Sequence, residues 1–305
     1  MNPLSKKKSL VGSIIIIVGI VIGAFMLISI KTDEDNGLDT SPPLQFNESN
    51  IKSLNIFAHM DDDLGGMNPD IYYDIQQAGT TGTVISNWFT GNTSGSDEAI
   101  EGGKVVYAFM ADMPNSWSTE TININNKDIK LQRLDGTNIY LINMMFPDGS
   151  PDGGNPISVE KLWKNEITTI STLDDGVEYT RDDVIQYIAD LISYFSIDTV
   201  RHLYHLGEFG DDKEHSDHHA MGKFAHEGVK LTPKELSTVI AYRADSQGED
   251  GWVKLTDEDE AINSEILDVY APHGDEYLLN WRNMPEIVED MGRIWRYSYI
   301  PEENK

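Results

Sequence analysis

Apolar residues recur along the chain in two patterns, short runs bounded by turns and longer stretches at helical spacing. The short runs predict strands, and the helical spacing predicts helices between them. The predicted strands are Leu54–Ala58, Thr83–Phe89, Ile139–Met145, Thr199–Leu206 and Val239–Tyr242. The predicted helices are Pro69–Gln77, Asp97–Met110, Asp182–Phe195 behind the N-cap Thr180, a segment ending near Glu227, and Asp257–Ala271. Strands that alternate with helices are typical of a single α/β domain with a mostly parallel, Rossmann-like sheet flanked by helices.

A different pattern precedes this domain, because the run Leu10–Ile30 holds no charged residue. At about 1.5 Å per residue it is about 31 Å long, which matches the hydrocarbon core of a bilayer. We expect residues 1–30 to be a cytoplasmic stub and an uncleaved transmembrane helix. A cleavable signal peptide, the alternative, has a shorter apolar run and a small-residue cleavage site. Three lysines, Lys6 to Lys8, precede the run and acidic residues follow it, which predicts a cytoplasmic N-terminus.

The prediction is therefore a single-pass protein of the cell membrane. Residues 31–50 are polar, contain two adjacent prolines and show no apolar periodicity, so they predict a linker. Residues 51–305 would form the α/β domain, on the extracellular side.

Net charge and cysteine content narrow the function. The chain has a formal net charge of −28 and no cysteine. Such a charge repels phosphate backbones, so nucleic acid is not an expected partner. Without cysteine, any transition metal must be held by His, Asp or Glu, and the eight histidines become the candidates. The sequence makes no prediction about oligomeric state.

The first polar cluster directly follows a predicted strand. His59, Asp61, Asp62 and Asp63 come after Leu54–Ala58. Open α/β sheets place ligands at the carboxyl ends of their strands, so this position suits a site. His59 and Asp62 have the residue types that bind a divalent metal, and Asp61 is then available for proton transfer. An acidic, solvated turn is the alternative for this cluster taken alone.

The second cluster, His215-Ser-Asp-His218, follows the predicted strand Thr199–Leu206. Both clusters are then expected at the same edge of the sheet. His59, Asp62 and His218 would supply two imidazoles and a carboxylate, the composition of an open hydrolytic zinc site. His219 is an alternative to His218 as the third ligand.

Three further side chains would complete the chemistry. Asp61 would act as the base on the attacking water. His215 would stabilise the charge that develops on a carbonyl oxygen, and Asp217 would fix the tautomer of an imidazole.

Together the two clusters resemble a known family. Ala58-His-Met-Asp-Asp-Asp63 and His215-Ser-Asp-His218 are similar to the motifs of the PIG-L/LmbE-like N-acetylglucosaminyl deacetylases, AHPDD followed by Glu or Asp, and HxDH. Met67-Asn-Pro-Asp70, Thr90-Gly91 and Phe146-Pro-Asp-Gly149 are secondary matches. The resemblance runs from about Leu54 to His226. Met60 replaces the usual proline and Asp63 the common glutamate, and we expect Asp63 to be structural.

The resemblance implies a function and residue roles. The function is metal-dependent removal of an acetyl group from an N-acetylated amino sugar or glycoconjugate. The metal ligands would be His59, Asp62 and His218, the general base Asp61 and the assisting histidine His215. Zn²⁺ is the expected metal, with Fe²⁺ or another divalent ion as alternatives.

Two other classes of function stay open. One is a surface module that binds glycan or calcium without turnover, although Asp61 would then have no task. The other is a metallohydrolase that acts on another amide or on an ester.

The remaining polar residues have weaker patterns. His202 and His205 lie three apart on a predicted strand and would point to opposite faces. His226 and His273 show no partner pattern. The segment from Asp148 to Gly153 resembles the start of a calcium loop, but Val159 stands at the twelfth position, so a turn is expected. Trp88, Trp117 and Trp163 are candidates to stack on a sugar, although core packing is the commoner role.

Overall fold

The computed structural model describes residues 51–79, 81–91, 96–210, 214–244, 252–273, 281–283, 293–294 and 296–299. The predicted transmembrane helix Leu10–Ile30 and the linker 31–50 lie outside these residues, so both stay predictions. Within the described ranges, no helix is long and apolar enough to cross a membrane.

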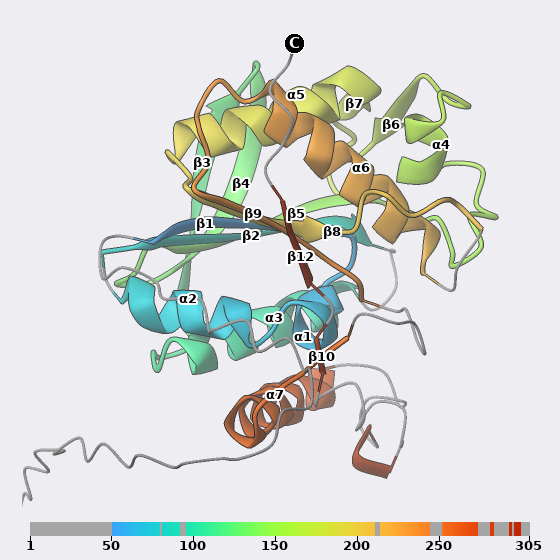
Figure 1. Cartoon of the computed structure of the whole chain (residues 1–305). Helices are drawn as coiled ribbons and strands as arrows, with labels where there is room; N and C mark the ends of the chain where they lie inside the picture. Colours follow the sequence, from blue (N-terminus) through green and yellow to red (C-terminus); the bar gives the residue numbers. More distant parts are fainter. Residues whose placement is uncertain are drawn as a thin grey trace, which may run out of the picture. The chain divides into compact units, whose positions relative to one another are not determined.

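An eight-stranded sheet forms the centre of the domain, in the order β12-β9-β8-β1-β2-β5-β4-β3 (Figure 1). Its strands are β1 (Lys52–Phe57), β2 (Thr83–Gly91), β3 (Trp117–Ile124), β4 (Lys127–Leu134), β5 (Ile139–Pro147), β8 (Thr199–Leu203), β9 (Thr238–Tyr242) and β12 (Arg296–Tyr299). The five central strands, from β9 to β5, pair in parallel. The mostly parallel α/β sheet predicted from the sequence is therefore confirmed.

The antiparallel edges of the sheet were not predicted. β12 pairs antiparallel with β9, and β3 and β4 form a hairpin that pairs antiparallel with β5. Asn125 and Asn126 join β3 to β4 with positive φ angles of 52° and 62°, a backbone conformation that asparagine tolerates in hairpin turns. The other strands of the described residues form two small two-stranded sheets. They are β6 (Thr169–Ser171) with β7 (Glu178–Thr180), and β10 (Val253–Lys254) with β11 (Arg293–Ile294).

Helices cover both faces of the sheet (Figure 1). α5 (Arg181–Tyr194) and α6 (Ser216–Leu231) lie on one face, and α1 (Asp62–Gly66), α2 (Asp70–Ala78) and α3 (Ser96–Met110) lie on the other. α7 (Asp257–Tyr270) packs against α3, and α4 (Val159–Trp163) against α6. Two short 3₁₀ helices, Ala271–His273 and Trp281–Asn283, follow α7. The N-cap prediction for Thr180 is confirmed, because its hydroxyl accepts from the Asp183 N–H in a capping box.

The sheet is buried on both faces, and one ion pair lies inside it. Leu54, Ile56 and Phe57 of β1 are buried, as is typical of a central parallel strand. Arg201 of β8 is completely buried and donates to both carboxylate oxygens of Asp74 on α2. Burying such an ion pair costs desolvation free energy. Removing one partner strongly destabilises the fold, because the other charge is left buried and unpaired.

One strand boundary corrects a prediction. β8 ends at Leu203, so His205 lies beyond the strand rather than on its opposite face. The His202 and His205 rings therefore approach, with centroids 5.6 Å apart. His226, for which no partner was expected, stacks on His205 with ring centroids 4.0 Å apart. The strict alternation of side chains applies only while a strand continues to pair.

Candidate metal centre

The two polar clusters follow neighbouring parallel strands. β1 pairs with β8, with Ser53 opposite Thr199 and Ile56 opposite His202. α1 begins at Asp62 directly after β1, and α6 begins at Ser216 beyond β8. The aspartate triplet therefore enters the first turn of a short helix rather than an open loop. Both clusters lie at one edge of the sheet, as the sequence predicted.

Three ligand-type atoms meet at this edge. The His59 Nδ1–Asp62 Oδ1 distance is 3.5 Å, the His218 Nε2–Asp62 Oδ1 distance is 2.9 Å, and the His59 Nδ1–His218 Nε2 distance is 3.1 Å. Ligands of a tetrahedral zinc ion, about 2.0 to 2.2 Å from the metal, lie about 3.3 to 3.6 Å apart. The donor set suits a divalent transition metal, and the three distances, 2.9 to 3.5 Å, come within about 0.4 Å of the tetrahedral spacing.

Asp62 is held so that one oxygen is available for a metal. Its Oδ2 accepts hydrogen bonds from the backbone N–H groups of Ala58 and His59, at 3.0 and 2.8 Å, which leaves Oδ1 for the centre. Burial disfavours the charged form of Asp62, but His218 and His59 outweigh it and hold the pKa of this carboxyl well below its usual range. Asp62 is therefore an ionised ligand-type carboxylate.

Carboxylates also stand behind both imidazoles. Glu214 Oε1 is 3.1 Å from His218 Nδ1 and accepts from the Ala244 N–H at 2.9 Å. Asp217 Oδ2 and Asp148 Oδ2 lie 3.5 and 3.6 Å from His59 Nε2. An acidic partner on the outer nitrogen keeps the proton there and leaves the inner nitrogen's lone pair for a metal.

The ionisation of His59 reflects these neighbours. Burial alone lowers the pKa of His59, but the charge of Asp62 and the bonds to Asp217 raise it to about 10. In the protein without metal, His59 is therefore a cation among carboxylates. A divalent ion would replace that proton on Nδ1, which fits a site built to hold positive charge.

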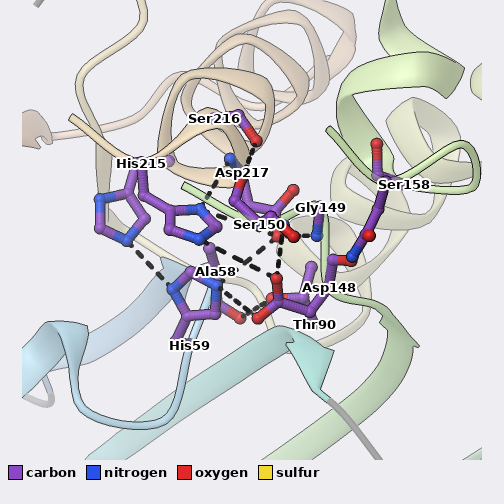
Figure 2. A network of polar contacts seen from close by, with 12 residues as sticks. Ala58, His59, Thr90, Asp148, Gly149, Ser150, Ser158, His215, Ser216 and Asp217 are labelled. Atoms are coloured by element: carbon purple, nitrogen blue, oxygen red, sulfur yellow. Dashed lines mark hydrogen bonds and ion pairs between the residues drawn. The ribbon is translucent and has the colours of Figure 1, made fainter. Parts of the chain in front are cut away.

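His215 and Asp217 lie beside His59 in the same cluster (Figure 2). His215 is the N-cap of α6, and its Nδ1 accepts from the Asp217 N–H at 3.2 Å. Its ring centroid is 4.4 Å from that of His59. Burial lowers the pKa of His215 to about 4, with further lowering by His59 and His218, so the imidazole is neutral near pH 7.

The orientation of Asp217 is specific. Its Oδ2 accepts from the Gly149 N–H at 2.8 Å and lies closer to His59 Nε2, at 3.5 Å, than to His215 Nδ1, at 3.9 Å. Of the two imidazoles that Asp217 can orient, the geometry favours His59.

Two of the aspartates have distinct environments. Asp61 is exposed at the N-cap position of α1, next to Asp62. Asp63 is completely buried and accepts from the Tyr107 hydroxyl at 2.9 Å, and burial raises its pKa to about 8. This environment agrees with the structural role expected for Asp63.

Sequence reasoning missed Glu214 and Asp148. Glu214 directly precedes the His215-Ser-Asp-His218 motif, and Asp148 belongs to the quoted segment Phe146-Pro-Asp-Gly149. Asp148 joins a second group with His59, His215 and Asp217 whose ligand atoms lie within 4.8 Å of one another. His59, His215 and His218 form another such group. His219 is buried beside Phe209, with ring centroids 5.6 Å apart, whereas His218 reaches Asp62.

The fold and this site define an α/β protein with a His/Asp group that can hold a metal ion. No model of a known protein family matches the chain, and no curated protein matches it.

Three solved structures are similar over most of the chain. An N,N′-diacetylchitobiose deacetylase from Pyrococcus horikoshii is 14% identical, with 82% of this chain and 84% of that chain covered and a TM-score of 0.45. A conserved protein from Thermus thermophilus is 12% identical, with 84% and 97% covered and a TM-score of 0.47. The 4-carboxy-2-hydroxymuconate hydratase of Pseudomonas putida is 9% identical, with 84% and 98% covered and a TM-score of 0.43. Likenesses of this size do not assign the chain to a family.

Proposed function

We propose that the protein is a metal-dependent hydrolase that removes an acetyl group from an N-acetylated amino sugar or a glycoconjugate. The observation that carries this proposal is the close approach of His59 Nδ1, Asp62 Oδ1 and His218 Nε2. Their spacing and their acidic outer partners support a catalytic metal site. The substrate class rests on the motif resemblance to the PIG-L/LmbE-like deacetylases.

The metal ligands would be His59, Asp62 and His218. A divalent ion bound there, Zn²⁺ or alternatively Fe²⁺, would polarise the acetyl carbonyl and acidify water. Each ligand keeps its inner lone pair because an outer hydrogen bond or carboxylate holds its other atom.

The protons would be moved by residues beside the ligands. Asp61 would take the proton of the attacking water and return it to the departing amine. His215 accepts the Asp217 N–H on Nδ1, so its Nε2 carries the proton and would donate to the oxyanion. Asp217 would keep His59 in the correct tautomer.

We further propose that residues 10–30 anchor the enzyme in the cell membrane with the catalytic domain outside. The uncharged run and the preceding lysines support this topology. An acidic domain is also a poor partner for nucleic acid.

A surface module that binds glycan or calcium, and a metallohydrolase of other amides or esters, are the competing functions. The test is acetate release from a panel of N-acetylated sugars and glycoconjugates by the full chain, with and without added Zn²⁺ or Fe²⁺. Acetate release that disappears after chelation supports the proposal. Sugar binding without acetate release would replace it with the binding module, and turnover of other amides or esters alone would replace the substrate class.

A paired measurement tests the site itself. His218→Ala should lose the bound metal, whereas His205→Ala, at a buried histidine outside the proposed ligands, should keep it. Full metal content in His218→Ala would move the third ligand to His219 or refute the site.

A further inference from the structure

A cavity lies on the α3 side of the sheet, and none of the three proposed metal ligands lines it. Its volume is about 230 Å³. It is bounded by α3, β2, β4 and β5, and the central residues are Trp88 of β2 and Asn143 of β5. These two residues are register partners in the parallel pair, so they lie side by side on one face of the sheet. We call this cavity the Trp88–Asn143 pocket.

Two hydrogen-bond donors at this pocket have no acceptor among the described residues. They are the Trp88 indole Nε1 and the Asn143 amide Nδ2. Trp88 is 1% exposed, and Asn143 is fixed because its Oδ1 accepts from the Met145 N–H at 3.1 Å. Buried donors are rarely left unpaired, because the lost hydrogen bond is costly. Both groups therefore call for acceptor atoms from something that enters the pocket.

The charged groups of the lining largely neutralise one another. Lys130 lies 3.4 Å from Asp174, and Lys104 lies 2.6 Å from Glu101 outside the lining. The remaining polar lining residues are Asp97 and Gln132, and the apolar ones are Ile100, Leu141 and Met145. A lining with donors, acceptors and apolar surface but little free charge suits a neutral, polyhydroxylated ligand.

Size and position favour one sugar ring. The pocket's 230 Å³ is below the range of about 300 to 1,000 Å³ for drug-sized ligands. Trp88 lies two residues, or about 7 Å, before Thr90 along β2. Thr90 donates from its N–H and its hydroxyl to the Ala58 carbonyl, next to His59. The pocket is therefore within reach of a second ring of a substrate held at the metal centre.

We propose that the Trp88–Asn143 pocket binds a neutral sugar ring of the glycoconjugate other than the one that is deacetylated. Trp88 Nε1 and Asn143 Nδ2 donate to its ring, hydroxyl or carbonyl oxygens. The link to deacetylation rests on the proposed function, whereas the sugar site itself does not.

The binding test uses the full chain labelled with ¹⁵N at tryptophan. Its six tryptophans provide six indole N–H signals. The signal of Trp88 is identified by its loss in Trp88→Phe or, if that variant does not fold, by its shift in Asn143→Asp. Titration with N-acetylglucosamine oligomers of one to four rings should shift the Trp88 signal. An unchanged Trp88 signal at saturating tetramer overturns the proposal. Water would then be the acceptor for the indole N–H.

The kinetic test separates this pocket from the metal centre. Asn143→Asp keeps the oxygen that accepts from Met145 but removes the donor. KM for the tetramer should rise about 3- to 10-fold, the value of one hydrogen bond, with kcat and the monomer's KM unchanged. Asn165→Asp makes the same change at an exposed residue and should alter neither. Equal KM values for Asn143→Asp and the wild type would refute the pocket's role in the reaction. If no sugar releases acetate, the proposed function fails, and the Trp88 signal alone decides the sugar site.

Discussion

Replacement of Glu214 tests whether the metal centre depends on the carboxylate behind His218. Glu214 Oε1 is 3.1 Å from His218 Nδ1, and both side chains are buried, so solvent screens their interaction little. Loss of such an outer partner typically weakens metal binding 10- to 100-fold, which corresponds to about 1.4 to 2.7 kcal/mol. We expect Glu214→Ala near the upper value and Glu214→Gln near the lower, because the glutamine Oε1 can still accept the hydrogen bond from His218 Nδ1 but carries no charge.

The assay is competition for Zn²⁺ between the protein and a chromophoric chelator, which reports Kd without any need for activity. Glu208→Gln is the matched control, because Glu208 is exposed and precedes the same motif; its Kd should equal that of the wild type. Circular dichroism checks that each variant is folded. A Kd within twofold of the wild type for folded Glu214→Ala would refute the reasoning.

Four other predictions follow from the same structure and sequence. Asp61→Asn should retain its metal but lower kcat for acetate release about 10²- to 10⁴-fold, and near wild-type turnover would exclude Asp61 as the base. Asp74→Ala and Arg201→Met should each lower the free energy of unfolding by about 3 to 5 kcal/mol in urea titrations; a loss below 1 kcal/mol would contradict the buried pair. Burial lowers the pKa of His202 to about 3, below the value of about 6.5 in the unfolded chain. The stability that comes from burying the neutral imidazole is therefore fully present above pH 6.5 and is lost as the pH falls toward 3. His202→Gln should therefore lose about 2 kcal/mol less stability than the wild type between pH 7 and pH 5, and equal losses would argue against it. Protease added to intact cells should remove the domain that follows Leu10–Ile30, and complete protection until lysis would reverse the topology.

The sequence alone determined the order of the central elements and the pairing of the two motifs. Apolar runs such as Leu54–Ala58 are buried on both faces, which makes them recognisable as parallel strands without tertiary information. A parallel strand releases its polar residues at its carboxyl end, so His59 and His218 could be placed at one edge before any distance was known. The membrane anchor Leu10–Ile30 stays a prediction from hydropathy.

The tertiary structure decided the features that depend on neighbours. The β3–β4 hairpin has alternating exposed residues that resemble a polar loop, and its strands are defined only by the pairing of β3 with β4 and of β4 with β5. His205 turns toward His202 because β8 stops at Leu203. Glu214 and Asp148 became partners of the imidazoles only through the folded backbone. The local periodicity of apolar residues indicates which face of a helix or strand is buried. The direction of a side chain beyond the end of a strand depends instead on contacts between residues distant in sequence.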